Sequence, residues 1–229
     1  MATVQASWLH KGYFVLRDDG LMRDVRDILE KSLRLRKGSL SVRMYPEDRA
    51  WKHTVWWREA REAFVEAQFF AQIARGYPVL SLGVAVEKGY GSIKVAKTPM
   101  KRMSRSWDWH RLIANAERFL SDVEDLGERF KRQPLSLRVT VTPASGRGSK
   151  TTAYSFVEGA WYERYVGHGT SRKIVQHLRD VSGMDDHWAI VHLACDLSPE
   201  EADGRTARTL ATTLIKFNGI RRRLRGLAP

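Results

Sequence analysis

The chain has 229 residues, of which 43% are hydrophobic, and its formal net charge is +13. A chain of this length and composition can bury the core of one or two globular domains. The single cysteine, Cys195, excludes an internal disulfide and any zinc site built from several cysteines.

The sequence also disfavours a membrane-spanning protein and a secreted protein. No apolar run approaches the roughly 18 residues of a membrane helix. The N-terminal residues lack the apolar core of a signal peptide, because Trp8–Lys11 interrupts it. We therefore expect a cytoplasmic protein without membrane association.

The first ninety residues predict alternating strands and helices. Residues 11–17 indicate a strand, and residues 21–33 have the apolar spacing of a helix. Residues 39–45 alternate between apolar and polar side chains, which is typical of a half-buried strand. Residues 57–75 predict a long helix with one apolar stripe, and residues 79–86 a buried strand.

The second part predicts elements in an order that suggests a fold. In chain order these are a strand at 92–96, a helix at 109–132, strands at 135–141 and 151–158, a helix at 171–181, a strand at 187–196 and a last helix capped by Ser198. From Ser92 this is the βαββαβ order of the ferredoxin-like fold. Because only a short loop separates residues 135–141 from residues 151–158, we expect these two strands to pair antiparallel.

We therefore predict an α+β protein with helices packed on antiparallel sheet. The expected regions are an N-terminal α/β region at 1–91 and a ferredoxin-like region at 92–229 that ends in a basic helix or tail. The sequence leaves open whether these regions form one continuous globular unit.

The uneven positive charge indicates a polyanionic partner, because excess charge of one sign opposes compaction. Acid-free stretches near residues 94–105 and 220–226 are typical of phosphate binding. The expected nucleic-acid-binding residues are Arg23, Arg26, Lys97, Lys101, Arg102, Arg105, Arg147, Lys150, Arg221, Arg222, Arg223 and Arg225. Alternatives are a solvated basic surface, an acidic protein partner, DNA in place of RNA, or an anionic membrane; the acidic residues of the last helix disfavour the membrane.

Two local patterns near residue 150 need separate interpretation. The segment Gly146–Thr151 lacks the glycine before Lys150 that a phosphate-binding loop requires, so that motif is rejected. Tyr154 and Phe156 share one face of a strand, where aromatic side chains stack bases in RNA-recognition modules. A role in the core is the favoured interpretation of both rings.

Catalysis has weaker support than binding. Asp185, Asp186 and Asp196 could hold a divalent metal, but two of them more simply form a turn and the third a strand end. The Glu87–Lys88 pair lacks the spacing of the metal-nuclease motif. Metal-independent RNA cleavage needs only a base and cations beside the phosphate. His10, Arg23 and His168 are the candidate catalytic residues for such an endoribonuclease, and no cofactor is expected.

The element order, the basic hairpin, the turn Ser182–Met184 and the basic appendages resemble the RAMP-type proteins of CRISPR systems. The resemblance spans about residues 92–197 and rests on element order. It implies an RNA-binding subunit of a ribonucleoprotein with protein partners, or a nuclease that processes guide-RNA precursors. The resemblance assigns no catalytic residue.

Overall fold

The computed structural model describes residues 2–12, 14, 19–45, 53–59, 67–73, 78–88, 107–130, 133–143 and 148–227. The fold is α+β, with a nine-stranded antiparallel sheet in the order β1-β2-β3-β4-β9-β5-β6-β7-β8. Contacts divide the chain into two units. The first unit comprises residues 1–62, 68–84 and 194–218, and the second comprises residues 63–67, 85–193 and 219–229. The boundary expected between residues 91 and 92 lies outside the described residues.

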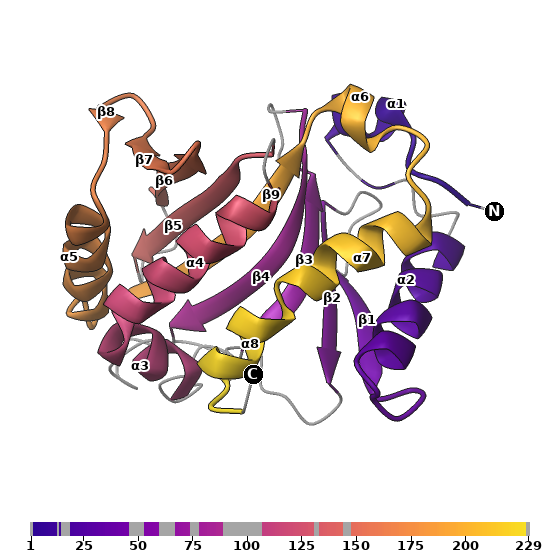
Figure 1. The fold of residues 1–229 in the computed structure, drawn as a ribbon, viewed down its shortest axis with the longest axis horizontal. Coiled ribbons are helices and arrows are strands. Elements are labelled where there is room, and N and C mark those ends of the chain that lie inside the picture. The colour runs from indigo at the N-terminus through magenta and orange to yellow at the C-terminus, as the bar shows by residue number, and fades with distance from the viewer. Residues whose placement is uncertain are drawn as a thin grey trace. The chain divides into compact units, whose positions relative to one another are not determined.

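In the first unit, helices cover one face of strands β1 (Leu40–Tyr45), β2 (Thr54–Glu59) and β3 (Gln68–Ile73). The helices are α1 (Ala6–Lys11), α2 (Asp19–Ser32), α6 (Pro199–Ala202) and α7 (Ala207–Lys216). In Figure 1, α2 and α7 lie side by side in front of these strands. The indole of Trp57 faces α2 and donates a hydrogen bond to the Met22 carbonyl at 3.0 Å.

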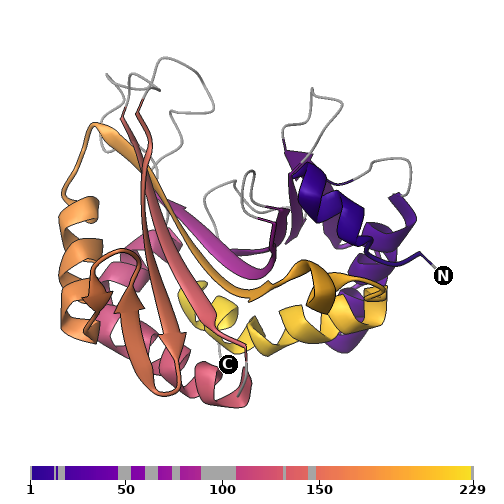
Figure 2. The same ribbon diagram turned by 90° about the horizontal axis from the view of Figure 1, so that it is seen from above.

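In the second unit, β5 (Leu135–Pro143) and β6 (Lys150–Val157) form the expected hairpin, with Leu137 opposite Tyr154. The short strands β7 (Ala160–Glu163) and β8 (Gly167–His168) extend it. Helices α3 (Trp107–Ala114), α4 (Ala116–Phe130), α5 (Ser171–Ser182) and α8 (Asn218–Leu224) complete the unit. Figure 1 shows α4 crossing one face of β5, and Figure 2 shows from above that α4 and α5 lie beside the strands.

Strands β4 (Leu80–Lys88) and β9 (His187–Leu197) contribute residues to both units. With β4 in place of the strand expected at residues 92–96, and apart from β7 and β8, the elements β4, α3–α4, β5, β6, α5 and β9 follow the strand-helix-strand-strand-helix-strand order. A ferredoxin-like sheet places the third of these strands between the first two, whereas here the last strand, β9, lies between β4 and β5. The α+β class is confirmed, and the ferredoxin-like arrangement is not.

Several sequence expectations differ from the structure. The helix expected at residues 57–75 is wrong, because residues 54–59 and 68–73 form β2 and β3. Residues 6–11 form α1, so Lys11 ends a helix where a strand was expected to begin. The helix expected at residues 109–132 is interrupted at Asn115, whose side-chain amide donates to the Arg111 carbonyl. The strand expected at residues 92–96 lies outside the described residues.

From Ser198 onward, the structure agrees in part with the sequence predictions. The Ser198 hydroxyl accepts from the Glu201 amide, and the Glu201 carboxylate accepts from the Ser198 amide, which completes the expected capping box. The last helical segment is divided after Lys216, and α8 begins at Asn218. The expected N-terminus of the helix is therefore correct, but it starts the four-residue α6.

Candidate nucleic-acid interface

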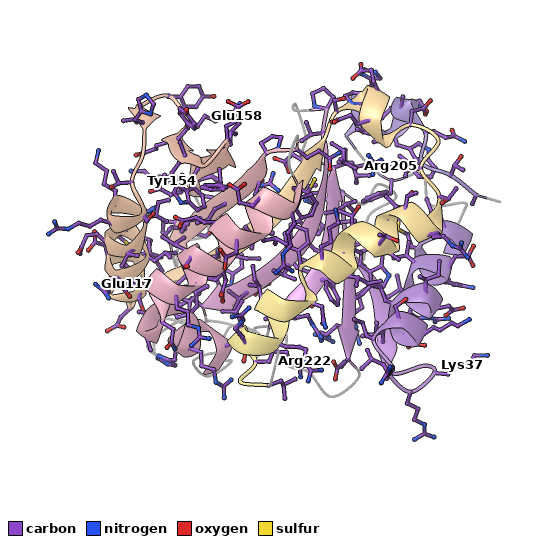
Figure 3. The ribbon with its side chains drawn as sticks, in the orientation of Figure 1. Lys37, Glu117, Tyr154, Glu158, Arg205 and Arg222 are labelled. Carbon is purple, nitrogen blue, oxygen red and sulfur yellow. The ribbon has the colours of Figure 1, made fainter. Side chains whose placement is uncertain are left out.

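Helix α8 places the C-terminal arginines, and its own sequence explains how. Ile220 and Leu224 are four residues apart, so they lie on one helix face, and both are buried. Because these two side chains hold α8 against the rest of the protein, the arginines between them are at least partly buried. Arg221 is only 2% exposed, while Arg222, labelled on α8 in Figure 3, and Arg223 are half-buried. The expectation that all three arginines contact phosphates therefore does not suit Arg221.

Helices α3 and α4 bring further arginines to the same place. Arg111 and Arg118 are seven residues apart and line a cavity of about 250 Å³ together with Arg223 of α8. The remaining wall of the cavity is largely apolar, with Leu112, Phe119, Ile220, Leu224 and Leu227. Arg118 is exposed, and Arg111 is half-buried. The cavity therefore combines guanidinium groups with apolar surface.

We name six residues the arginine cluster: Arg111, Arg118, Arg221, Arg222, Arg223 and Arg225. Two carboxylates lie among them. The Asp122 carboxylate accepts from the Arg223 guanidinium at 2.8 Å. Asp108, which is buried, accepts from the Arg111 guanidinium at 3.1 Å and from the Ala67 amide at 2.7 Å. The cluster therefore holds more positive than negative charge.

The pKa values of both carboxylates are raised. Burial raises the pKa of Asp108, and the Ala67 amide and Arg225 oppose that rise. Burial also raises the pKa of Asp122, against the opposing charges of Arg223 and Arg118. In both cases desolvation outweighs the opposing charges of the neighbouring arginines.

The cluster has the chemistry of an anion site. A guanidinium offers a planar fork of donors that matches two oxygens of one phosphate, and it stays charged at any physiological pH. Several such groups around a cavity with an apolar wall can hold a phosphate while an apolar group rests beside it. Arg118 is the member best placed to reach a ligand, because it is exposed, and Arg222 is half-buried on α8.

The other expected binding residues are dispersed. Lys150 begins β6 and is exposed, and its position in a strand agrees with rejecting a phosphate-binding loop. Arg23 and Arg26 lie on α2, where Arg26 pairs with Asp27 at 2.7 Å. Five others lie outside the described residues, namely Lys97, Lys101, Arg102, Arg105 and Arg147.

The candidate catalytic residues do not share a unit. His10 on α1 and Arg23 on α2 belong to the first unit, whereas His168 on β8 belongs to the second. All three side chains are exposed. No cluster of metal-ligating side chains occurs in the part of the chain that the structure describes.

The Glu87–Lys88 pair has a structural role instead of a nuclease role. Lys88 is buried, and its ammonium group donates to the carbonyls of Val181 in the last turn of α5, of Met184 after it and of His187 at the start of β9. The Glu87 carboxylate accepts from the Trp188 indole at 3.3 Å. Asp186 pairs with His187 at 2.6 Å, which fits a turn before β9.

Two interpretations of single residues are confirmed. Tyr154 and Phe156 are buried, and the Phe156 ring packs so closely against α4 that only glycine fits at Gly127. Tyr154, labelled on β6 in Figure 3, shares a 2.7 Å hydrogen bond with the His177 imidazole. Cys195 is buried, and burial raises the pKa of its thiol to about 12, so it is a structural residue.

Sequence reasoning missed Arg111 and Arg118. Acid-free stretches were the signal for binding residues, and these two arginines stand among the carboxylates of residues 107–130. Their spacing could have found them, because Arg111, Asn115, Arg118 and Asp122 recur every three or four residues and so follow one helical stripe.

Comparison of this chain with protein-family models, with curated proteins and with solved structures finds no match. Each helix in the described ranges is too short or too polar to span a membrane. The candidate interface therefore rests on the geometry and charge of the chain's own residues.

Proposed function

We propose that this protein binds nucleic acid through phosphates at the arginine cluster, as an RNA-binding subunit of a ribonucleoprotein. The observation that carries the proposal is the meeting of Arg111, Arg118 and Arg223, from α3, α4 and α8, around one cavity. Asp122 also lines this cavity and pairs with Arg223, and the buried Asp108 pairs with Arg111. The net charge of +13 favours the same class of partner. RNA is favoured over DNA because of the resemblance in element order to RAMP-type proteins, and the proposal does not need a ferredoxin-like sheet.

The test is the salt dependence of binding to a labelled single-stranded RNA. Each neutralised phosphate contributes about 0.7 to the slope of log affinity against log salt for a single strand. We expect the double variant R118Q/R222Q to lower the magnitude of that slope by up to about 1.4, measured by fluorescence anisotropy between about 50 and 200 mM salt. These substitutions remove the guanidinium groups of the exposed Arg118 and the half-buried Arg222 and leave the buried Arg221 in place.

A matched control separates the cluster from general charge. Arg208 is exposed on α7, outside the cluster, and R208Q removes one positive charge from the surface. We expect R208Q to keep the wild-type slope. Binding that is insensitive to salt, or that is absent at low salt for single- and double-stranded RNA and DNA alike, would contradict the proposal.

The same samples address the nuclease alternative, which no described site favours. RNA that stays intact on incubation with the purified protein supports a binding subunit. Cleavage that persists in EDTA and leaves 2′,3′-cyclic phosphate ends would instead identify a metal-independent endoribonuclease. Identifying the RNA and proteins that co-purify tests membership of a ribonucleoprotein directly.

A further inference from the structure

The β7–β8 hairpin exposes aromatic side chains at its tip. Among the described residues, five large hydrophobic side chains are exposed, and three of them, Tyr162, Tyr165 and Val166, lie on this hairpin. Tyr165 is 92% exposed and Val166 65% exposed. Apolar side chains gathered in one short hairpin indicate a contact surface rather than scattered exposure.

The backbone at the tip is unfavourable for the residue it carries. Tyr165 has a φ of 70°, in the left-handed region that costs a side-chain-bearing residue about 1–2 kcal/mol. Glycine would adopt this conformation without that cost. Because the ring is almost fully exposed, burial does not offset the strain, and an outlier of this kind points to a functional contact.

The rings at the tip are arranged in pairs. Tyr162 stands opposite His168 across the hairpin, with ring centroids 5.1 Å apart. The Arg164 guanidinium lies over the Tyr165 ring, 5.1 Å from its centroid. Flat aromatic and guanidinium groups at an accessible tip are the groups on which unpaired bases stack.

The charge along this segment suits a nucleic acid strand. Residues 164–179 contain no aspartate or glutamate, and Arg172 and Lys173 are exposed in the first turn of α5, directly after the hairpin. Carboxylates do line the hollow between the hairpin and α4, where Glu124 accepts from the Trp161 indole and the Ser171 hydroxyl. These carboxylates would repel phosphates from that side, so a strand would approach the tip from the side of Tyr165.

We propose that the tip of the β7–β8 hairpin stacks unpaired bases and makes the protein select single strands over duplexes. This inference rests on the proposed binding of nucleic acid and adds its substrate class. Phosphate contacts at the arginine cluster are available to both forms, because both present a phosphate backbone. Stacking on Tyr165 does distinguish them, because only an unpaired base has a free face.

The test uses two substitutions at one position and two nucleic acids. Y165G removes the ring and suits the left-handed backbone, so the variant is expected to fold at least as well as the wild type. Y165F keeps the ring. With a short oligo(U) strand we expect Y165G to weaken affinity about 5- to 100-fold and Y165F to retain it, while an RNA duplex binds all three proteins equally. The salt slope should not change, because no phosphate contact is removed.

The possible outcomes separate this inference from the proposed function. Salt-dependent binding of oligo(U) that Y165G leaves unchanged would overturn the stacking role and leave phosphate binding standing. Failure of the wild-type protein to bind either nucleic acid would overturn both. If light scattering shows a wild-type dimer and a Y165G monomer with equal affinity for oligo(U), the tip is a contact between copies of the chain and the inference is wrong.

Discussion

At the scale of single residues, His192 carries a clear energetic consequence. It lies in β9 and is buried, and burial, with a smaller contribution from Arg138, lowers the pKa of its imidazole to about 3. The ordinary pKa of histidine is 6.5. The folded protein therefore keeps this imidazole neutral under conditions where the unfolded chain would protonate it.

We predict that His192 makes the fold sensitive to acid. Because the folded pKa is depressed, the unfolded state binds the extra proton as the pH falls below 6.5, so stability is lost until the pH reaches about 3. The free energy of unfolding should fall by about 1.4 kcal/mol per pH unit in that window from this residue alone. The measurement is urea unfolding at a series of pH values for the wild type and for H192Q.

The comparison of slopes isolates the histidine from other groups. Asp108 and Asp122 have raised pKa values, so they contribute the opposite sign, with stability lost as the pH rises through their titration. Both carboxylates are present in wild type and variant. H192Q should therefore show the shallower dependence even if it is less stable at neutral pH, and parallel curves would show that His192 is not the cause.

At the scale of elements, the accuracy of the sequence predictions follows from how each strand is buried. β5 was predicted correctly because its apolar side chains alternate with polar ones. Leu135, Leu137 and Val139 are buried on one face, and Arg138 and Thr140 are partly exposed on the other. β2 and β3 were predicted as one helix because side chains on both faces of each strand are buried. Without alternation, the apolar residues of 57–75 matched a helical stripe by chance.

The sequence predicts one part of the candidate interface and misses another. The four arginines of residues 221–225 are visible in the sequence, but their burial is not, because the burial of Arg221 depends on how Ile220 and Leu224 anchor α8. Arg111 and Arg118 join them only through the packing of α3 and α4, so the sequence alone does not show the cluster. The tip of the β7–β8 hairpin was missed because its left-handed tyrosine has no signature in the sequence.

One element depends on a single buried ammonium group. Lys88 at the end of β4 donates to three carbonyls at the end of α5 and before β9. The Val181 carbonyl lies in the last turn of α5, where the negative end of the helix dipole favours a cation. We predict that K88M, which keeps the apolar stem, lowers the free energy of unfolding by about 1.5–3 kcal/mol.

The loss should be local as well as global. Amide exchange near Val181 should become faster in K88M, because the carbonyls that terminate α5 lose their donor. The matched control is K216M on α7, where the lysine is exposed and the expected change is below about 0.5 kcal/mol. Equal stability of the two variants would show that Lys88 does not anchor α5.

At the scale of the whole molecule, the excess of 13 positive charges makes a polyanion part of the energetics. Like charges repel in the compact state, and a ligand that binds only the folded protein stabilises it in proportion to the logarithm of its concentration. A phosphate polymer should therefore raise the melting temperature. A polymer of carboxylates should raise it less, because we expect the guanidinium groups around the cavity to match a phosphate backbone.

We predict a rise of about 5–10 °C with poly(U) at about one hundred times its dissociation constant, since that excess is worth about 2.7 kcal/mol and a chain of this size shifts about 2–4 °C per kcal/mol. The measurement is thermal unfolding at low salt with poly(U), with polyglutamate and with neither. R118Q/R222Q should reduce the shift caused by poly(U), measured against the melting temperature of the same variant without polymer. Equal shifts from poly(U) and polyglutamate, unaffected by the double variant, would mean that overall charge rather than the arginine cluster recognises the partner.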